Sequence, residues 1–475
     1  MSETTTKKTP RQVGLGVAIL CVVILCVIFC GGFSFWKVNT QVIFLMAAVA
    51  MAVVGLFHGH SLSDIQEYFL EGCRGAVMPA LILMTVGAVI GSWMVSGIVP
   101  TIIYYGLGIL TPSTFLLAGF IMCCLISFFT GSSYTAISTI GIALLGIGMG
   151  LGTNPAITAG MIISGSLFGD KLSPFSDSTN MAAAAAGTDV FSHVGSMLYT
   201  TVPATVISGI LYFVLGLRQA GSTMDTSAIE AIRTTLAANF NITPILLIIP
   251  IITIVMTIKK VPPIVALVIS ALSAVIFAFI FQGGFYDFKT IMSTMGGGFS
   301  ISTDLADVNK LLSRGGMQGM ASPVILTFLA LGMGSILKRI GVLDALLGRL
   351  ANIVNTSRSL VITTLAACLL TTMVCASQYV AILLPGQVMQ PAYTRLKIKK
   401  TVLSRTLEDG GTIFCFLLPW TTSGVYVPSV IGVPVLSYAP YAFFCLLCPI
   451  LCIIYALTGF AIWKDDEVPQ ETTVE

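Results

Sequence analysis

The sequence predicts an all-α membrane protein that crosses the bilayer many times. Hydrophobic residues make up 56% of its 475 residues and charged residues only 9%, whereas soluble domains carry about 25% charged residues. Apolar segments close to the length of about 20 residues that a helix needs to span a bilayer recur along the chain. The net charge of +3 gives no reason to expect a nucleic-acid partner.

These apolar segments can be marked along the whole sequence. The first, residues 13–33, is too long for the apolar part of a secretory signal and has no small-residue cleavage site after it. We therefore expect it to be retained as the first spanning helix. The others are residues 38–57, 75–99, 197–217, 244–258, 262–281, 323–337 and 438–462.

Two stretches of the chain resemble each other, which indicates an internal repeat. Residues 78–103 align with residues 321–347, and Pro79 then lies opposite Pro323. The similarity continues on both sides of this stretch. Downstream, for example, TGSSYTAIS in the first half matches CASQYVAIL in the second.

We therefore expect two membrane repeats, residues 13–217 and 243–463, joined by a polar linker at 218–242. Basic residues gather before the first repeat and in one loop of the second repeat, whose counterpart in the first is uncharged. Because Lys and Arg favour the cytoplasmic side, this asymmetry predicts that the repeats insert in opposite orientations, with both tails, 1–12 and 464–475, in the cytoplasm. The basic residues are Lys7, Lys8, Arg11, Arg395, Lys397, Lys399, Lys400 and Arg405.

Within each repeat the sequence predicts a re-entrant hairpin followed by a broken crossing. The hairpin covers 114–149 in the first repeat and 359–393 in the second, and the broken crossings cover 155–187 and 401–432. This tracing gives about ten crossings plus two hairpins. The alternative is that the hairpin arms are further full spans.

The most informative motif follows a run of 95 residues, 75–169, without a charged side chain or a histidine. The segment GDKLSPFSDSTN then brings Asp170, Lys171 and Asp177 close together in sequence. Pro174 removes a backbone donor and disfavours helix at the residue before it, so the chain should unwind here. Unwound backbone at membrane depth is tolerated only where it is buried or lines a cavity, and intramembrane carboxylates usually mark an ion or proton pathway.

The unwound segment supplies hard oxygen ligands of the kind that alkali cations prefer. A carboxylate in such a pocket can hold either a proton or a cation, which is the minimum requirement for exchange. The alternative is that both carboxylates pair at a cytoplasmic loop. The candidate residues are Asp170, Ser173, Ser176, Asp177, Ser178, Thr179 and Asn180.

The second repeat carries a similar group. Glu408 and Asp409 precede Gly410 and Gly411, which permit a break in the helix, and no charged side chain follows until after Trp463. The alternative for the acidic pair is an interfacial salt bridge to Arg405. Further oxygen ligands in this half are Thr412, Thr421 and Thr422.

The hairpin tips carry polar side chains at matching points of both repeats, where they could close the site: Ser132, Ser133, Ser377 and Gln378. A hydroxyl in a membrane helix often bonds only to its own backbone, which is the alternative for the serines. His58, His60 and His193 lie in polar connections, where we expect them to be exposed. The cysteines show no metal-cage spacing beside a histidine, and we expect no cofactor.

Five segments of the chain, in the same order, closely resemble motifs of the NhaC family of bacterial sodium/proton antiporters in the ion transporter superfamily. The likeness covers nearly the whole chain. The family motif often reads SPLSDTTN, where this chain has Phe175 and Ser178, and neither change removes an oxygen ligand. The matching segments are GSLFGDKLSPFSDSTN, MLYTTVPA, SRTLEDGGT, LLPWTTSGV and PYAFFCLLCPI.

The resemblance implies a transporter, not an enzyme, that exchanges Na+ for H+ across the bacterial cytoplasmic membrane. It also implies a scaffold domain that often forms a homodimer, residues 13–110 and 243–354, and a transport domain, residues 113–187 and 356–432, that moves like an elevator. Asp177 and Asp409 would bind Na+. The whole implied site is Asp170, Ser176, Asp177, Thr179, Asn180, Asp409 and Thr412.

Other functions remain to be weighed against ion exchange. The family also contains exchangers of malate for lactate, so the alternative is a Na+- or H+-coupled exchanger of small organic anions or amino acids. Only Lys171 is a candidate membrane-embedded cation near the motif, which favours a bare ion as the substrate. An intramembrane aspartyl protease would need paired Asp residues in a GxGD-like setting, which the sequence does not have.

Overall fold

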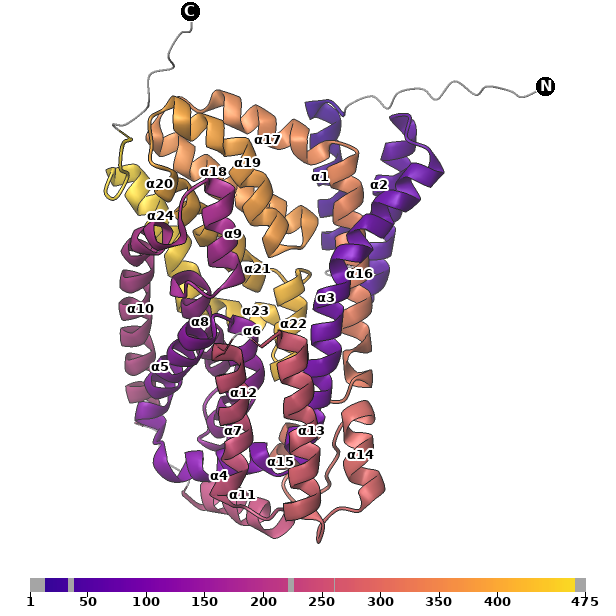
Figure 1. The fold of residues 1–475 in the computed structure, drawn as a ribbon, viewed down its shortest axis with the longest axis vertical. Coiled ribbons are helices and arrows are strands. Elements are labelled where there is room, and N and C mark those ends of the chain that lie inside the picture. The colour runs from indigo at the N-terminus through magenta and orange to yellow at the C-terminus, as the bar shows by residue number, and fades with distance from the viewer. Residues whose placement is uncertain (1–12, 33–37, 221–225, 260, 466–475) are drawn as a thin grey trace, which may run out of the picture.

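The computed structural model describes residues 13–32, 38–220, 226–259 and 261–465, and within these ranges every regular element is a helix (Figure 1). In this part of the chain eight helices are long and apolar enough to span a membrane, or up to 11 if each bent pair counts as one span. The prediction of an all-α, multi-pass membrane protein is therefore confirmed.

The described residues of the first half form ten α-helices, with a π-helical turn, Ile137–Gly141, between the sixth and the seventh. The tenth runs past the expected end of the first repeat into the linker. The helices are α1 (Leu15–Cys30), α2 (Thr40–Phe57), α3 (Leu62–Val95), α4 (Ile98–Ile109), α5 (Pro112–Thr130), α6 (Ser133–Ala136), α7 (Ile142–Gly150), α8 (Pro155–Leu172), α9 (Asp177–Ala186) and α10 (Val190–Ala220).

The linker holds a helix of its own, α11 (Thr226–Asn239), and the second half follows with a similar order of long and short helices. A second π-helical turn, Glu408–Thr412, lies between α20 and α21. The helices are α12 (Ile248–Ile258), α13 (Pro263–Gln282), α14 (Phe288–Gly297), α15 (Ala306–Leu312), α16 (Ala321–Arg339), α17 (Val342–Ile353), α18 (Ser357–Cys375), α19 (Gln378–Arg395), α20 (Lys400–Leu407), α21 (Ile413–Leu417), α22 (Thr422–Ile431), α23 (Val435–Tyr438) and α24 (Phe443–Thr458).

Helix α3 is much longer than the segment expected from hydropathy. It begins at Leu62, where Ser61 and Asp64 form a reciprocal cap on the first turn. The amphipathic stretch before the apolar segment therefore continues into it without a turn. The helix ends at Val95, and Gly97, which directly precedes α4, has a φ of +79° that suits glycine.

The ends of matching helices have the same backbone conformation in both halves. Thr111 and Thr356 each begin a helix, α5 and α18, with the same reciprocal hydroxyl cap. Helices α9 and α22 both end in a left-handed glycine, with φ +72° in each case. Local sequence has thus produced the same start and stop signals twice.

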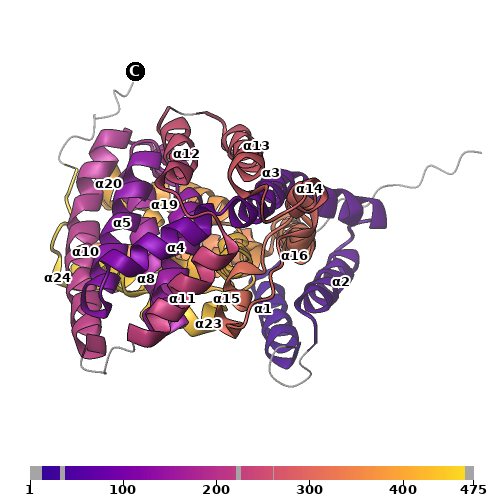
Figure 2. The same ribbon diagram turned by 90° about the horizontal axis from the view of Figure 1, so that it is seen from below.

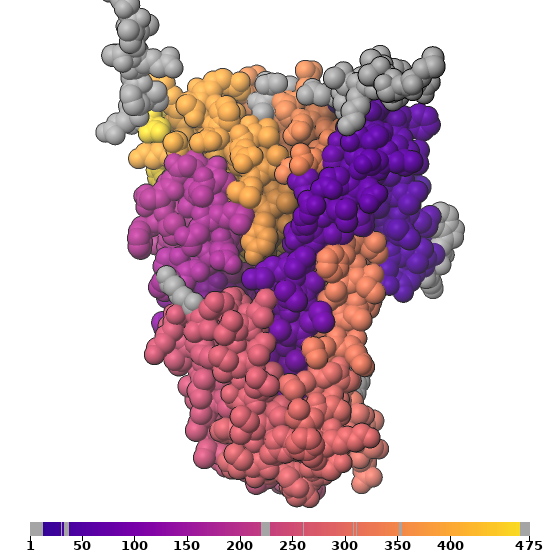
Figure 3. Space-filling view, turned by 45° about the vertical axis from the view of Figure 1, so that its right-hand side comes forward, coloured from indigo at the N-terminus to yellow at the C-terminus, as the bar shows by residue number. Residues whose placement is uncertain are grey.

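Helices of each half pack on helices of the other half, and these contacts are reciprocal. The long helices α3 and α16 pack side by side along one edge of the molecule, where Figure 3 shows their indigo and orange surfaces interlocking. Helix α2 of the first half packs on α16, and α13 of the second half packs on α3. Likewise α9 packs on α19, and α22 packs on α7 and the π-turn before it.

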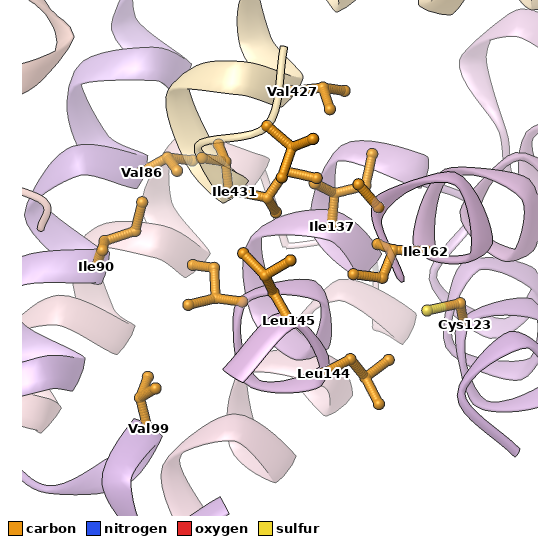
Figure 4. Packing of buried hydrophobic residues seen from close by; sticks show 14 of the residues in the cluster. Val86, Ile90, Val99, Cys123, Ile137, Leu144, Leu145, Ile162, Val427 and Ile431 are labelled. Carbon is orange, nitrogen blue, oxygen red and sulfur yellow. The ribbon is translucent and has the colours of Figure 1, made fainter. Parts of the chain in front are cut away.

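Two groups of helices lie next to each other in this arrangement. Seen from below, α5, α8, α10 and α24 lie on one side and α2, α3, α14 and α16 on the other (Figure 2). Apolar side chains fill part of the space between the groups. Figure 4 shows Val86 and Ile90 of α3 facing Leu145 of α7 and Ile431 of α22, and all four are at most 1% exposed.

The break in the second broken crossing does not lie at its two glycines. The chain stays helical through Gly410 and Gly411 as a π-turn and breaks instead at residues 418–421, with a bend of 47°. Pro419 lies in that break. The glycines serve close packing, because a Cβ on Gly410 would lie 2.7 Å from Cβ of Cys368.

Candidate ion-binding site

The predicted unwound segment is present between α8 and α9. Helix α8 ends at Leu172 and α9 begins at Asp177. The carbonyls of Pro174 and Ser176 accept hydrogen bonds of 2.9 and 2.8 Å from the side-chain amide nitrogen of Asn180. The side chain of Asn180 therefore holds the break in shape.

Asp170 is 5% exposed and lies at the meeting point of this break and the first hairpin tip. Its carboxylate accepts a hydrogen bond of 3.1 Å from the backbone N–H of Ser133, and another from the hydroxyl of the same residue. Its backbone carbonyl accepts the hydroxyls of Ser178 and Thr179. Asp170 is thus held inside the protein by the first hairpin tip and the start of α9.

A cavity of about 380 Å³ opens beside the unwound segment. Asp177 is exposed to it, and oxygen-bearing side chains of both hairpin tips line it together with the start of α13. The predicted site residues in its wall are Ser132, Asp170, Ser176, Asp177, Ser178, Asn180 and Gln378.

A smaller cavity of about 130 Å³ adjoins the first and shares Ser132, Asp177 and Tyr379 with it. It extends between α3, α13 and α16 on one side and the hairpin tips and α22 on the other. Ser377 and Thr422 line it as well. The two cavities thus lie where the two groups of helices meet.

The two hairpin tips are joined through the start of α22. The hydroxyl of Tyr134, on the first tip, lies 2.8 Å from the hydroxyl of Ser423, and Tyr426 donates a hydrogen bond of 2.8 Å to the carbonyl of Tyr134. The backbone N–H of Thr422 donates a hydrogen bond of 2.9 Å to Ala376 on the second tip. Residues from both halves therefore form one wall of the site.

The acidic pair of the second half lies behind this wall, outside the residues that line the cavities. Asp409 forms an ion pair with Lys171, and both side chains are fully buried. The hydroxyl of Thr200 donates a hydrogen bond of 3.1 Å to the same carboxylate oxygen. The second carboxylate oxygen of Asp409, Oδ2, has no hydrogen-bond partner.

Glu408 is also fully buried, and its partners differ from those expected. Thr412 donates a hydrogen bond of 2.8 Å to its Oε1, and its Oε2 lies 4.0 Å from Nε2 of His193. His193 is 0% exposed and His60 is 7% exposed, so the expectation that these two histidines are exposed was wrong, because tertiary packing buries both. Arg405 donates to the carbonyl of Ala461 at 2.8 Å and is not among the ion pairs of the described residues, so the alternative pairing with the acidic residues is not observed.

The remaining predicted residues support the site from outside its lining. Ser173 accepts a hydrogen bond of 3.3 Å from the N–H of Phe175, and Thr421 caps α22 by accepting the N–H of Gly424 at 3.0 Å. Ser133, Thr179 and Thr412 bond to the carboxylate residues as described above. Within the described residues, no three His, Cys, Asp or Glu side chains gather as a metal cage.

Sequence reasoning missed several residues of this region. Thr200 lies within the MLYTTVPA segment, which the family resemblance had already singled out, so that motif was a usable signal. Tyr134 directly follows Ser133 and Tyr379 directly follows Gln378 at the hairpin tips, but neither tyrosine is charged, and His193 gave no signal beyond its type. Their roles follow from positions that only the folded chain defines.

Broken helices, polar hairpin tips and a buried carboxylate that lines a cavity between them are typical of ion-coupled secondary transporters. The chain belongs to the Na+/H+ antiporter family, whose family model matches residues 1–179 and 165–460. It is 36% identical to the Na+/H+ antiporter NhaC of Alkalihalophilus pseudofirmus, over 96% of this chain and 98% of the relative.

Two further similarities involve other transported solutes. The chain is 38% identical to the malate-2H+/Na+-lactate antiporter of Bacillus subtilis, over 90% of this chain and 92% of that one. A solved structure of MtrF from Neisseria gonorrhoeae, described among antimetabolite efflux pumps, covers 91% of this chain and 97% of its own, with 12% identity and a TM-score of 0.42.

Proposed function

We propose that this protein exchanges Na+ for H+ across the bacterial cytoplasmic membrane, with the cavity beside the unwound segment as the exchange site. Family membership and the NhaC relative support the exchange reaction. The observation that carries the choice of site is the position of Asp177, whose carboxylate is open to both cavities between the hairpin tips.

The exchange follows from competition for one carboxylate. When Asp177 is ionised, it attracts Na+, and the neighbouring oxygens of Ser132 and Gln378 can replace part of the water around the cation. When it is protonated, that attraction is lost and the cation leaves. Because the two states exclude each other, a gradient of one ion can drive the other.

The buried charges behind the cavity have a different role in this proposal. Lys171 neutralises Asp409, so α8 and the π-turn of the second half stay together whether the cavity is occupied or empty. Direct binding of Na+ by Asp409 stays a prediction, and only its Oδ2 is free for it.

We also propose that the halves are inverted repeats and that the transport domain, 113–187 and 356–432, moves against the scaffold, 13–110 and 243–354. The reciprocal packing of α2 on α16 and of α13 on α3 supports the symmetry. The smaller cavity supports the movement, because its lining comes from both domains.

The test is Na+-driven proton movement in proteoliposomes that contain Asp177→Asn. The substitution keeps the size of the side chain but removes the charge that Na+ and H+ compete for, so exchange should be lost. Asp189→Asn is the matched control, because Asp189 is exposed and only caps α10. Exchange at the wild-type rate in the Asp177 variant would refute the assignment.

A second candidate function is exchange of a small organic anion, which the Bacillus subtilis relative favours through its 38% identity. The same proteoliposomes decide between the two. A Na+ gradient alone should move protons if the substrate is the bare ion. A strict requirement for malate or lactate would favour the organic exchanger.

A further inference from the structure

The walls of the two adjoining cavities differ in polarity, and binding of Na+ alone does not explain this difference. The larger one is lined by Asp170 and by most of the oxygen-bearing side chains of the unwound segment. The smaller one has mainly apolar walls, which come from α3, α13 and α16 and include Ile82, Leu83, Val86, Leu267 and Leu331. A metal cation gains nothing from such walls, since its favourable contacts are with oxygen atoms.

The volume of the larger cavity also exceeds the needs of one ion. At about 380 Å³ it falls in the range of about 300–1,000 Å³ that is typical of small-molecule sites. A single water occupies about 30 Å³ of liquid, so a cation with a few waters would leave most of the space open. The cavity could therefore hold a small organic molecule.

The charge of the lining indicates the sign of that molecule. Among the described residues that line the two cavities, Asp170 and Asp177 are acidic and none is Lys, Arg or His. Lys171 is fully buried and paired with Asp409. Lys259, which is exposed, is not part of the lining.

The helix N-termini at the site offer little to an anion. Thr421 already caps the first turn of α22, and the first turn of α9 carries Asp177 itself. A carboxylate substrate would thus meet a negative charge at the point where a positive helix end would otherwise attract it. An organic cation finds Asp177 as its counter-charge, and the rings of Tyr134 and Tyr379 line both cavities beside it.

We propose that these cavities bind a small organic monocation with a primary ammonium group and a short alkyl chain, in competition with Na+. The ammonium group lies beside Asp177, and the alkyl chain lies in the smaller, apolar cavity. This inference rests on the proposed function only in placing the Na+ site at Asp177.

The test measures binding of methyl-, propyl- and pentylammonium chloride to the detergent-purified full-length protein by calorimetry. No ion gradient is needed, so the ability of amines to cross membranes does not disturb the result. Each added methylene that enters the apolar cavity should tighten binding about fourfold. Added Na+ should weaken the binding competitively.

Three variants distinguish amine binding at this site from other sources of a binding signal. Asp177→Asn should abolish binding, whereas uptake of the longer amines by detergent micelles would persist in it. Ala266→Phe should remove the dependence on chain length, because Ala266 lines the smaller cavity. Leu272→Phe, on the exposed side of the same helix, should keep that dependence, since Leu272 is 50% exposed.

Several outcomes would overturn the inference. One is the absence of pentylammonium binding in a protein that exchanges Na+ for H+. Another is binding of butanoate or hexanoate, the matched carboxylates, in place of the amines. If exchange of Na+ for H+ is absent but the amines still bind at Asp177 in competition with Na+, the proposed function fails and this inference stands. Amine binding that added Na+ does not weaken would overturn the inference, whether or not exchange is present.

Discussion

Breaking the buried ion pair between Lys171 and Asp409, which joins α8 of the first half to the π-turn of the second, should be one of the most destabilising single substitutions, because one charge stays buried without its partner. Both side chains are 0% exposed. The substitution Lys171→Met leaves Asp409 with the hydroxyl of Thr200 as its remaining partner. Removing one member of a fully buried pair costs about 3–5 kcal/mol, since the other charge stays in a medium of low dielectric constant.

The double variant, Lys171→Met with Asp409→Asn, should recover most of this loss. Replacing both charges by neutral side chains removes the desolvation penalty together with the attraction. The free energy of unfolding can be measured for wild type, both single variants and the double variant by denaturation in mixed micelles. The cycle then gives the coupling between the two residues.

A surface pair provides the matched control. Arg74 and Glu67 are 2.8 Å apart, but their side chains are 69% and 56% exposed. Because exposed pairs contribute about 0–1 kcal/mol, Arg74→Met should change the stability very little. The reasoning is refuted if Lys171→Met costs no more than Arg74→Met, or if the double variant is less stable than both single variants.

Two further predictions concern packing and orientation. A Cβ on Gly169 would lie 2.0 Å from the backbone carbonyl carbon of Ser127, so Gly169→Ala should separate α5 from α8. The yield of monodisperse protein in size-exclusion chromatography should then fall sharply. Gly195→Ala should match the wild type, because a Cβ on Gly195 would meet open space. Helices α20 and α11 lie near opposite ends of the molecule (Figure 1); the exposed Lys399 directly precedes α20, and the exposed Glu230 belongs to α11. A cysteine at Lys399 should therefore react with an impermeant reagent only from the cytoplasm and one at Glu230 only from outside, and labelling of both from one side would contradict the orientation.

Local chemistry explains why parts of the structure could be predicted from the sequence. Pro174 has no backbone donor, and the chain does unwind around it between α8 and α9. The hairpin turns at residues 131–132 and 376–377 also lie where the matching polar tips indicated. These features depend on a few neighbouring residues, so the sequence is sufficient to find them.

Other features depend on residues far apart in the chain. Lys171 and Asp409 are 238 positions apart, and no local pattern indicates that they meet. The double glycine of the second half seemed to mark a break, but a π-turn keeps its backbone bonded, and the break follows at Pro419. His193 seemed to lie in a polar loop, whereas tertiary packing buries it beside Glu408.

The central claim is that Na+ and H+ compete for the carboxylate of Asp177 in the cavity between the hairpin tips. Equilibrium binding of radioactive Na+ to the purified protein at several pH values tests it most directly. We expect the apparent Kd to rise as the pH falls, at constant capacity, and binding to vanish in Asp177→Asn but persist in Asp189→Asn. Na+ binding that is independent of pH, or unchanged in the Asp177 variant, would contradict the account.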